Sequence, residues 1–230
     1  MCCRFWMEES PELREIVEEM SNSPLVRKWQ KTIRITAYGE VRPTDIVPII
    51  APNKAGKRKV FPMKWGYSGK SLILNARVET AAEKPTFKDD WIRHRCIIPA
   101  SWYFEWEHLR GNDGKTHTGD KYMIQTAESP MTWLCGLYRI EEALPVFVVI
   151  TREADESIRF IHDRMPLIMP ERAVDDWIDP ARDPKGLLRY SVVKIIYEKT
   201  KQETVFWHSA QPCDGAGADA GDELDGVCRS

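Results

Sequence analysis

The sequence predicts an α+β fold with a largely antiparallel β-sheet or distorted β-barrel at its core and short helices around it. Segments with strand character outnumber segments with helical character along the chain. These strands do not alternate regularly with helices, as they would in a parallel βαβ architecture. The chain has 230 residues and is 43% hydrophobic, which is enough to bury a substantial core and excludes a wholly disordered protein.

The first expected element is an amphipathic helix that begins after Ser10. Pro11 occupies the first turn, where a missing backbone N–H is tolerated. The apolar residues Leu13, Ile16, Val17 and Met20 then recur at the spacing of one helical face. This segment is therefore predicted to pack one side against the core.

Strand signals dominate the rest of the chain. The expected strands are residues 45–50, 59–65, 71–76, 95–98, 102–107, 121–126, 131–138, 144–151, 165–169 and 191–197. Gly111 and Gly114 indicate a long hairpin loop over residues 108–120. Short helices are expected at residues 85–94, 153–161 and 171–178.

We expect residues 1–210 to form a single domain and residues 211–230 to form a disordered acidic tail. The tail is rich in Gly, Ala and Asp, a composition that buries too little apolar surface to fold. The whole chain has a net charge of −2, whereas without residues 213–230 it has 32 basic and 30 acidic residues. Binding to nucleic acid would therefore depend on a local basic patch.

Membrane and secretion signals are absent from the sequence. No stretch is apolar over the roughly 18 to 20 residues that span a bilayer, and the first residues lack the basic and then apolar pattern of a signal peptide. We expect a cytoplasmic protein that is a monomer. The six cysteines form no Cys-x-x-Cys pair and no spacing typical of zinc ligands, so no metal site is expected. Cys96 and Cys135 lie in apolar runs typical of buried, reduced cysteines.

Cys2 is suited to covalent chemistry once Met1 has been removed. A small second residue permits that removal, which leaves an amine and a thiol on one residue. The amine can form a Schiff base with an aldehyde, and the thiol can close onto the same carbon to form a five-membered thiazolidine. An α-amine has a pKa of about 7.7–8.0, so part of it is unprotonated near neutral pH. Taken alone, a cysteine at the second position is not diagnostic, because free cysteines usually pack in the interior.

Three further clusters contain side chains suited to catalysis or to phosphate binding. Asn75 can orient a hydroxyl or carbonyl, and the nearby Arg77 can bind phosphate in a bidentate manner. Glu105 lies among aromatic residues, where desolvation raises the pKa of a carboxyl and suits it to proton transfer. His162 has polar neighbours that can set its pKa. Each cluster alone is also compatible with a structural role.

Together, these motifs resemble the SOS-response-associated peptidase family, the abasic-site-processing proteins. The chain begins Met-Cys-Cys-Arg-Phe, similar to the Met-Cys-Gly-Arg-[Phe/Tyr] of the family, and Trp65 and Gly66 match its Trp-Gly element. The motif Asn-Ala-Arg-x-Glu-Thr matches residues 75–80 completely. The motif from Arg-Cys to Glu-Trp matches residues 95–106, and His-Asp-Arg-Met-Pro matches residues 162–166. The matches follow one another in order over most of the chain.

The resemblance implies a protein that senses abasic sites in single-stranded DNA and forms a covalent thiazolidine crosslink through Cys2. It implies that Asn75 holds the sugar-derived hydroxyls and the N-terminal residue. It implies that Glu105 transfers protons during Schiff-base formation and ring opening. His162 would act as acid or base in ring opening, strand elimination or crosslink reversal.

The same resemblance implies a set of DNA-binding residues. They are Arg4, Arg77, Thr151 and Arg164. It further implies an associated abasic-site lyase activity and removal of Met1 by the protein itself, which would be a peptidase reaction. No metal or organic cofactor is implied, since water and protein groups suffice for imine chemistry.

Three features depart from the family pattern, and two other functions stay open at this stage. Residues 38–43, Tyr-Gly-Glu-Val-Arg-Pro, stand where the family has Arg-[Tyr/Phe]-Asn-x-x-Pro. Cys3 stands where the family has Gly, which places a second thiol beside the site. Residues 68–71 form a short polar loop, whereas many members have a Pro- and Trp-rich loop there that stacks on DNA bases. The other functions are a cysteine peptidase with Cys2 as nucleophile and His162 as base, and a non-catalytic single-stranded DNA-binding module.

Overall fold

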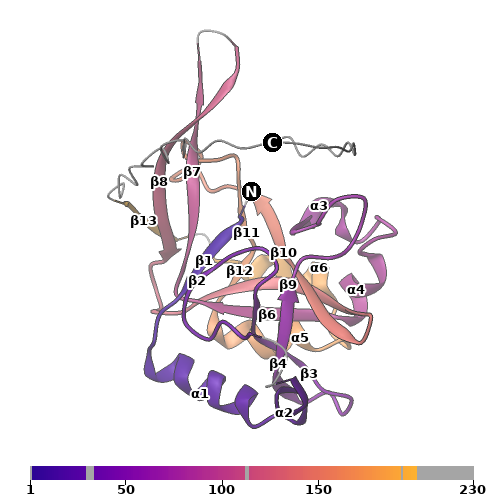
Figure 1. The fold of residues 1–230 in the computed structure, drawn as a ribbon. Helices are drawn as coiled ribbons and strands as arrows, with labels where there is room; N and C mark the ends of the chain where they lie inside the picture. The colour runs from indigo at the N-terminus through magenta and orange to yellow at the C-terminus, as the bar shows by residue number, and fades with distance from the viewer. Residues whose placement is uncertain (1, 30–33, 112–113, 193, 201–230) are drawn as a thin grey trace, which may run out of the picture.

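The computed structural model describes residues 2–29, 34–111, 114–192 and 194–200. Two β-sheets form the centre of this part of the chain, and short helices lie around them (Figure 1). The predicted α+β class with a barrel-like, largely antiparallel core is confirmed. No helix within these four ranges is long and apolar enough to cross a bilayer. The predicted acidic tail, residues 211–230, lies outside the described residues.

The larger sheet contains a closed five-stranded barrel. Its strands are β3 (Ile46–Pro52), β4 (Arg58–Trp65), β6 (Arg95–Ala100), β9 (Thr132–Glu141) and β10 (Leu144–Glu153). Neighbouring strands run antiparallel, except that β10 and β4 are parallel. The ring closes because β10 pairs with both β4 and β9. All six residues of β6 are buried, as expected for a continuous apolar run enclosed by other elements.

Three short strands extend the barrel sheet near the end of β10. They are β5 (Asn75–Arg77), β11 (Arg164–Pro166) and β12 (Ile168–Met169). β5 lies parallel to β10, and β11 lies antiparallel to it, while β12 pairs with β9. Thr151 of β10 is opposite Arg77 on one side and Pro166 on the other. Two segments far apart in the sequence therefore meet at this end of β10.

The smaller sheet is open and has five strands. In spatial order they are β13 (Ile195–Lys199), β8 (Thr116–Thr126), β7 (Trp102–Arg110), β1 (Arg4–Met7) and β2 (Gly39–Val41). β7 and β8 extend away from the body as a long hairpin (Figure 1). The two sheets share one core, because Phe5 of β1 packs against Trp65 of β4 with ring centroids 5.1 Å apart.

The helices are short and cover the ends and outside of the sheets. They are α1 (Pro11–Ser21), α2 (Pro24–Trp29), α3 (Val78–Ala81), α4 (Lys88–Arg93), η1 (Glu171–Ala173), α5 (Val174–Ile178), α6 (Pro184–Leu187) and η2 (Leu188–Tyr190). α1 is the helix that the sequence predicts after Ser10. The Ser10 hydroxyl accepts a hydrogen bond from the Leu13 N–H at 3.2 Å, and Leu13, Ile16 and Met20 are buried. The predicted N-cap and apolar face are confirmed.

Several strand boundaries differ from the prediction. The expected loop at residues 108–120 is mostly strand, because β7 continues to Arg110 and pairs with β8 from Thr116 onward, with one register shift between Trp106 and His108. Its polar composition suits an exposed hairpin as well as a loop. The expected strand at residues 165–169 is two strands, since Leu167 donates to β10 and accepts from β9. β5 and β13 begin later than predicted, and β1 and β2 were not predicted at all.

The predicted helix at residues 153–161 is wrong. This segment forms turns between β10 and β11 (Figure 1). The Asp155 carboxylate accepts the Ser157 N–H at 3.0 Å, which is a local alternative to a helix, and the Ala154 N–H donates to the Asp163 carbonyl at 2.9 Å. The segments predicted at 85–94 and 171–178 contain the shorter helices α4 and α5.

Arg95 at the start of β6 fixes two helices to the barrel. Its side chain is fully buried, yet its donors are satisfied by backbone carbonyls at distances from 2.5 to 3.0 Å. The accepting carbonyls belong to Trp91, Ile92, Trp177, Asp179 and Arg182. A guanidinium is thus able to bind the carbonyl ends of α4 and α5 at once.

Replacing Arg95 with Met should lower the free energy of unfolding by at least about 3 kcal/mol, because several buried carbonyls would lose their donor. Urea denaturation of both proteins measures this difference. Arg93→Met, at an exposed position of α4, is the matched control and should change stability by less than about 0.5 kcal/mol. Equal losses for the two variants would contradict the role given to Arg95.

Candidate active site

Cys2 lies at the centre of the candidate site, just before β1. Its side chain is 1% exposed, and its thiol lies 3.7 Å from the Arg4 carbonyl. The Asn75 amide donates to the Cys2 carbonyl at 3.0 Å. Because β1 pairs antiparallel with β7, with Arg4 opposite Phe104, the residues before Arg4 run alongside Glu105. The fold therefore brings the start of the chain to residues 75 and 105.

Asn75 reaches this position from the barrel sheet. It is the first residue of β5 and is opposite Val149 of β10. Its side-chain carbonyl oxygen is buried and accepts no hydrogen bond within the described part of the chain. A buried acceptor without a donor is unfavourable. The amide thus holds Cys2 with its nitrogen and presents its oxygen for a hydroxyl or amine donor.

Glu105 lies on β7 and is 4% exposed. Burial raises the pKa of its carboxyl above the usual range, as the aromatic sequence context predicts. Burial also raises the pKa of the Cys2 thiol, and the negative charge of Glu105 adds to that shift. The pKa of the Cys3 thiol is raised for the same two reasons. The site therefore favours a protonated thiol next to a carboxyl that can hold a proton.

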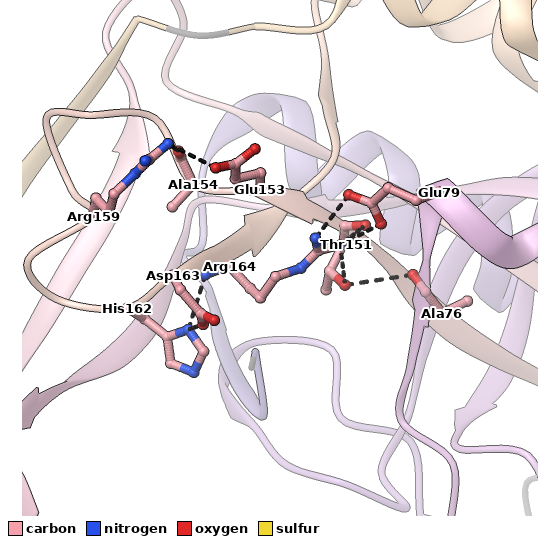
Figure 2. A network of polar contacts seen from close by, with 9 residues as sticks. All are labelled: Ala76, Glu79, Thr151, Glu153, Ala154, Arg159, His162, Asp163 and Arg164. Carbon is pink, nitrogen blue, oxygen red and sulfur yellow. Dashed lines mark hydrogen bonds and ion pairs between the residues drawn. The ribbon is translucent and has the colours of Figure 1, made fainter. Parts of the chain in front are cut away.

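His162 lies in the turn between β10 and β11 and is 7% exposed. Burial lowers the pKa of its imidazole to about 4, so the ring is neutral at pH 7. Its Nδ1 lies 3.0 Å from the Arg164 N–H and 2.7 Å from an Asp163 carboxylate oxygen (Figure 2). These contacts need opposite protonation of Nδ1. We favour the amide contact, because the Asp163 side chain is exposed to water, and the proton then sits on Nε2.

His108 is a site neighbour that the sequence does not reveal. The centroid of its ring lies 4.2 Å from that of the His162 ring. Its backbone N–H donates to the Ile161 carbonyl at 3.0 Å. Electrostatic repulsion from His108 is a further cause of the lowered pKa of His162. A polar hairpin position gives no signal for this contact, because the two histidines come together only when the hairpin packs on the turn.

Arg164 is held inside the protein rather than presented to solvent. Its guanidinium makes two contacts with the Glu79 carboxylate, at 2.7 and 2.9 Å, and donates to the Thr151 carbonyl at 2.7 Å (Figure 2). Thr151 is fully buried, and its hydroxyl lies 3.5 Å from the Ala76 carbonyl. The Arg164 contact lowers the pKa of Glu79. These residues join β5, α3, β10 and β11 into one network.

The other two predicted arginines differ in their surroundings. Arg4 forms an ion pair with Glu40 of β2 and lies over the Trp106 ring, 5.8 Å from its centroid. Arg77 ends β5, is exposed, and makes no ion pair within the described residues. In those same ranges, no three His, Cys, Asp or Glu side chains come together in a way that could hold a metal ion.

The fold and site define a class of β-barrel protein whose candidate site is assembled around the first residues of the chain. An amide and a carboxyl from two separate segments lie beside that point, and an imidazole from a third segment packs against His108 on the strand that carries the carboxyl. The family model of the SOS response associated peptidases (SRAP) matches residues 1–208, and this chain belongs to that family.

Curated relatives agree with this assignment, and a solved structure shares the fold. The abasic site processing protein YoqW of Bacillus subtilis (strain 168) is 29% identical over 202 residues, which cover 81% of this chain and 84% of YoqW. YoaM of the same organism, also named an abasic site processing protein, is 35% identical over 158 residues, 63% of this chain and 66% of YoaM. A crystal structure from Bacteroides thetaiotaomicron has the same fold, with a TM-score of 0.66 at 22% identity over 87% of this chain and 92% of that chain.

Protein stability should reveal the neutral state of His162. The unfolded chain takes up a proton on this imidazole near pH 6.5, whereas the folded protein does so near pH 4. Its contribution to stability is therefore lost as the pH falls through this window. His162→Gln cannot titrate and should remove about 3 kcal/mol of the decrease in unfolding free energy between about pH 7 and pH 4. Identical pH profiles for the two proteins, measured by urea denaturation, would contradict the lowered pKa.

Proposed function

We propose that this protein processes abasic sites in single-stranded DNA by forming a covalent thiazolidine crosslink through Cys2, after loss of Met1. The crosslink would shield the lesion during the response to DNA damage. The curated relatives are named abasic site processing proteins, which supports the substrate class. The recessed position of Cys2 favours a flexible single strand over a duplex, because an abasic sugar without a paired base is cheap to extrude.

One observation carries the proposal, namely the position of two polar side chains, those of Asn75 and Glu105, beside Cys2. Asn75 holds its carbonyl, Glu105 is close enough to raise the pKa of its thiol, and His162 lies in the turn beside the β7–β8 hairpin. A cysteine that only packs in a core needs neither a buried carboxyl nor a buried amide acceptor near it. An aldehyde bound there would find an amine, a thiol, a proton donor and a hydrogen-bonding amide together.

The proposed chemistry balances without a change of oxidation state. The α-amine of Cys2 adds to the aldehyde carbon of the ring-opened sugar, and loss of one water gives an imine. The sulfur then adds to the carbon of this imine, whose nitrogen keeps one of the two amine hydrogens, while the thiol gives up its proton. Protonated Glu105 can give its proton to the leaving hydroxyl, and the resulting carboxylate can accept the thiol proton. One aldehyde and one aminothiol thus give one thiazolidine and one water.

The other residues take supporting roles in this proposal. His162, neutral at pH 7, would accept or donate a proton in sugar ring opening, strand elimination or crosslink reversal. The imine also permits β-elimination of the 3′-phosphate, which is the associated lyase activity, and self-removal of Met1 remains part of the proposal. Arg4 and the exposed Arg77 would bind flanking phosphates. Arg164, paired with Glu79, would position Thr151 and β11 and meet phosphate only by exchanging that partner.

The geometry gives less support to a cysteine peptidase. A nucleophilic cysteine acts as its thiolate, and burial raises the pKa of the Cys2 thiol well above its usual range. The thiol therefore stays protonated at neutral pH. The proposed reaction starts from the neutral amine and needs the thiol only to close the ring. A non-catalytic binding module would leave the buried carboxyl next to Cys2 without a function.

Exchange of Cys2 tests the proposal most directly. A thiazolidine needs the amine and the thiol on the same residue, and the Cys3 nitrogen is an amide. Cys2→Ala should therefore abolish the stable crosslink to an abasic single strand, while Cys3→Gly should preserve it. A variant with an uncleavable residue before Cys2 should also fail, although both thiols remain. Intact mass after denaturation measures the adduct.

Each competing function predicts a different outcome of the same experiment. A thiol nucleophile would tolerate the added residue, and a binding module would give no adduct that survives denaturation with any protein. A stable adduct that forms at Cys3, or in the extended protein, would overturn the aminothiol mechanism.

Glu105→Gln should slow crosslink formation by about 10²–10⁴-fold, because it removes the proton donor while keeping the shape of the side chain. Glu107→Gln, on the same strand but only half-buried, is the matched control and should crosslink at the wild-type rate. Single-turnover rates on an abasic oligonucleotide measure both. Similar rates for Glu105→Gln and wild type would refute the role of Glu105.

A further inference from the structure

Three aromatic rings form a surface cluster outside the site described so far. Tyr122 of β8, Tyr197 of β13 and Phe160 of the turn before His162 contact one another edge to face, with ring centroids 5.4 to 6.0 Å apart. Phe160 is 47% exposed and Tyr197 is 44% exposed, while Tyr122 is half-buried. Large rings at this exposure keep part of their faces open to solvent. We call these three residues the aromatic cluster.

The register of the smaller sheet connects this cluster to Glu105. Tyr122 is directly opposite Glu105, so both side chains lie on the same face of the sheet. Tyr197 is opposite Ile124, which is itself opposite Tyr103, two residues from Glu105, so the Tyr197 ring is on that face too. Neighbouring strands are about 4.8 Å apart. The backbone of Tyr122, one strand away, therefore lies about 5 Å from that of Glu105, and the strand that carries Tyr197 lies about 10 Å from β7.

The turn that contains Phe160 connects the aromatic cluster to His162. Phe160 is two residues from His162, and the Ile161 carbonyl accepts the His108 N–H from β7 at 3.0 Å. The aromatic cluster is therefore adjacent to the Glu105 carboxyl and the His162 imidazole of the candidate site. Lys199, opposite Tyr122, adds a cation to the same face, where it pairs with Asp120 at 2.5 Å. Aromatic faces next to a cation are the elements of single-strand binding surfaces.

We infer that the aromatic cluster stacks an unpaired base of the DNA strand that carries the abasic site, within about three nucleotides of the lesion. The inference rests on the proposed function and adds that the aromatic cluster binds a base of the same DNA strand. A base provides a planar partner for the open ring faces, and stacking tolerates any sequence. The lesion has no base of its own, so only the neighbouring bases offer the protein a planar surface for stacking near the abasic sugar. Phosphate contacts alone would not require exposed rings.

Binding to two single strands tests this inference without crosslinking. Both carry a tetrahydrofuran analogue of the abasic site, which has no aldehyde; in one the flanking nucleotides keep their bases, and in the other they lack them. The full-length wild-type protein should bind the strand with bases at least about fivefold more tightly. Phe160→Leu and Tyr197→Leu should each reduce this preference, because Leu keeps an apolar side chain but cannot stack. Phe160→Tyr should retain it.

The controls separate stacking from other effects. Tyr190→Leu removes a ring that is 38% exposed in η2, outside the cluster, and should keep the wild-type preference. Phe160 and Tyr197 come from different segments, so a change in both variants cannot arise only from a displaced His162. If the variants weaken binding equally on both strands, the rings support the protein structure and the inference is wrong.

Failure of the inference is distinct from failure of the proposed function. A wild-type protein that crosslinks abasic DNA but binds both analogue strands equally would overturn the inference alone. The exposed rings would then fit a protein partner better than a base. A wild-type protein that prefers flanking bases but never crosslinks would overturn the covalent mechanism and leave the stacking surface in place.

Discussion

The pairing of β1 between β7 and β2 is the constraint on which the candidate site depends. It places Arg4 opposite Phe104 and Phe5 opposite Tyr103, and this register brings Cys2 beside Glu105. A slip of one residue would turn Phe5 away from Trp65 and the core, so burial of that ring fixes the register. The barrel contributes Asn75 and His162 only because the same core joins the two sheets. The site is thus a product of sheet docking.

Burial shifts the titratable groups of the site toward their neutral forms. The pKa values of the Cys2 thiol and the Glu105 carboxyl are raised, and that of the His162 imidazole is lowered to about 4. An uncharged thiol, an acid that can hold a proton and a neutral base suit a sequence of proton transfers around an amine. The charged side chains lie at the margin, where Arg4 meets Glu40 and Arg164 meets Glu79.

The sequence predicts most barrel strands because their apolar runs are long and bounded by turn residues. It fails where local pattern and tertiary contact disagree. Residues 153–161 have apolar spacing that suits a helix, but the Asp155–Ser157 turn and the contact with β11 hold them in another form. β1 is too short to be recognised, since its four residues become a strand only between two partners.

The candidate site was predictable to a similar degree. Family motifs select Cys2, Asn75, Glu105 and His162 as candidates, and the fold brings Asn75 and Glu105 beside Cys2 and places His162 against His108 of β7. The contact between His108 and His162 joins residues far apart in the sequence, as does the pairing of Arg164 with Glu79 across 85 residues. Burial of Thr151 follows from its place between β5 and β11. Such pairings depend on topology, which a single sequence does not encode in local pattern.

The interior position of β1 has a mechanical consequence for a protein bound covalently to DNA. A strand attached at Cys2 would transmit tension to the end of β1, along its axis. Because β1 is bonded on both sides, to β7 and to β2, such a load has to shear two ladders of hydrogen bonds together. An edge strand could instead be peeled away one bond at a time. At the proposed attachment point the sheet is therefore better able to resist a pull from the DNA than it would be at an edge strand.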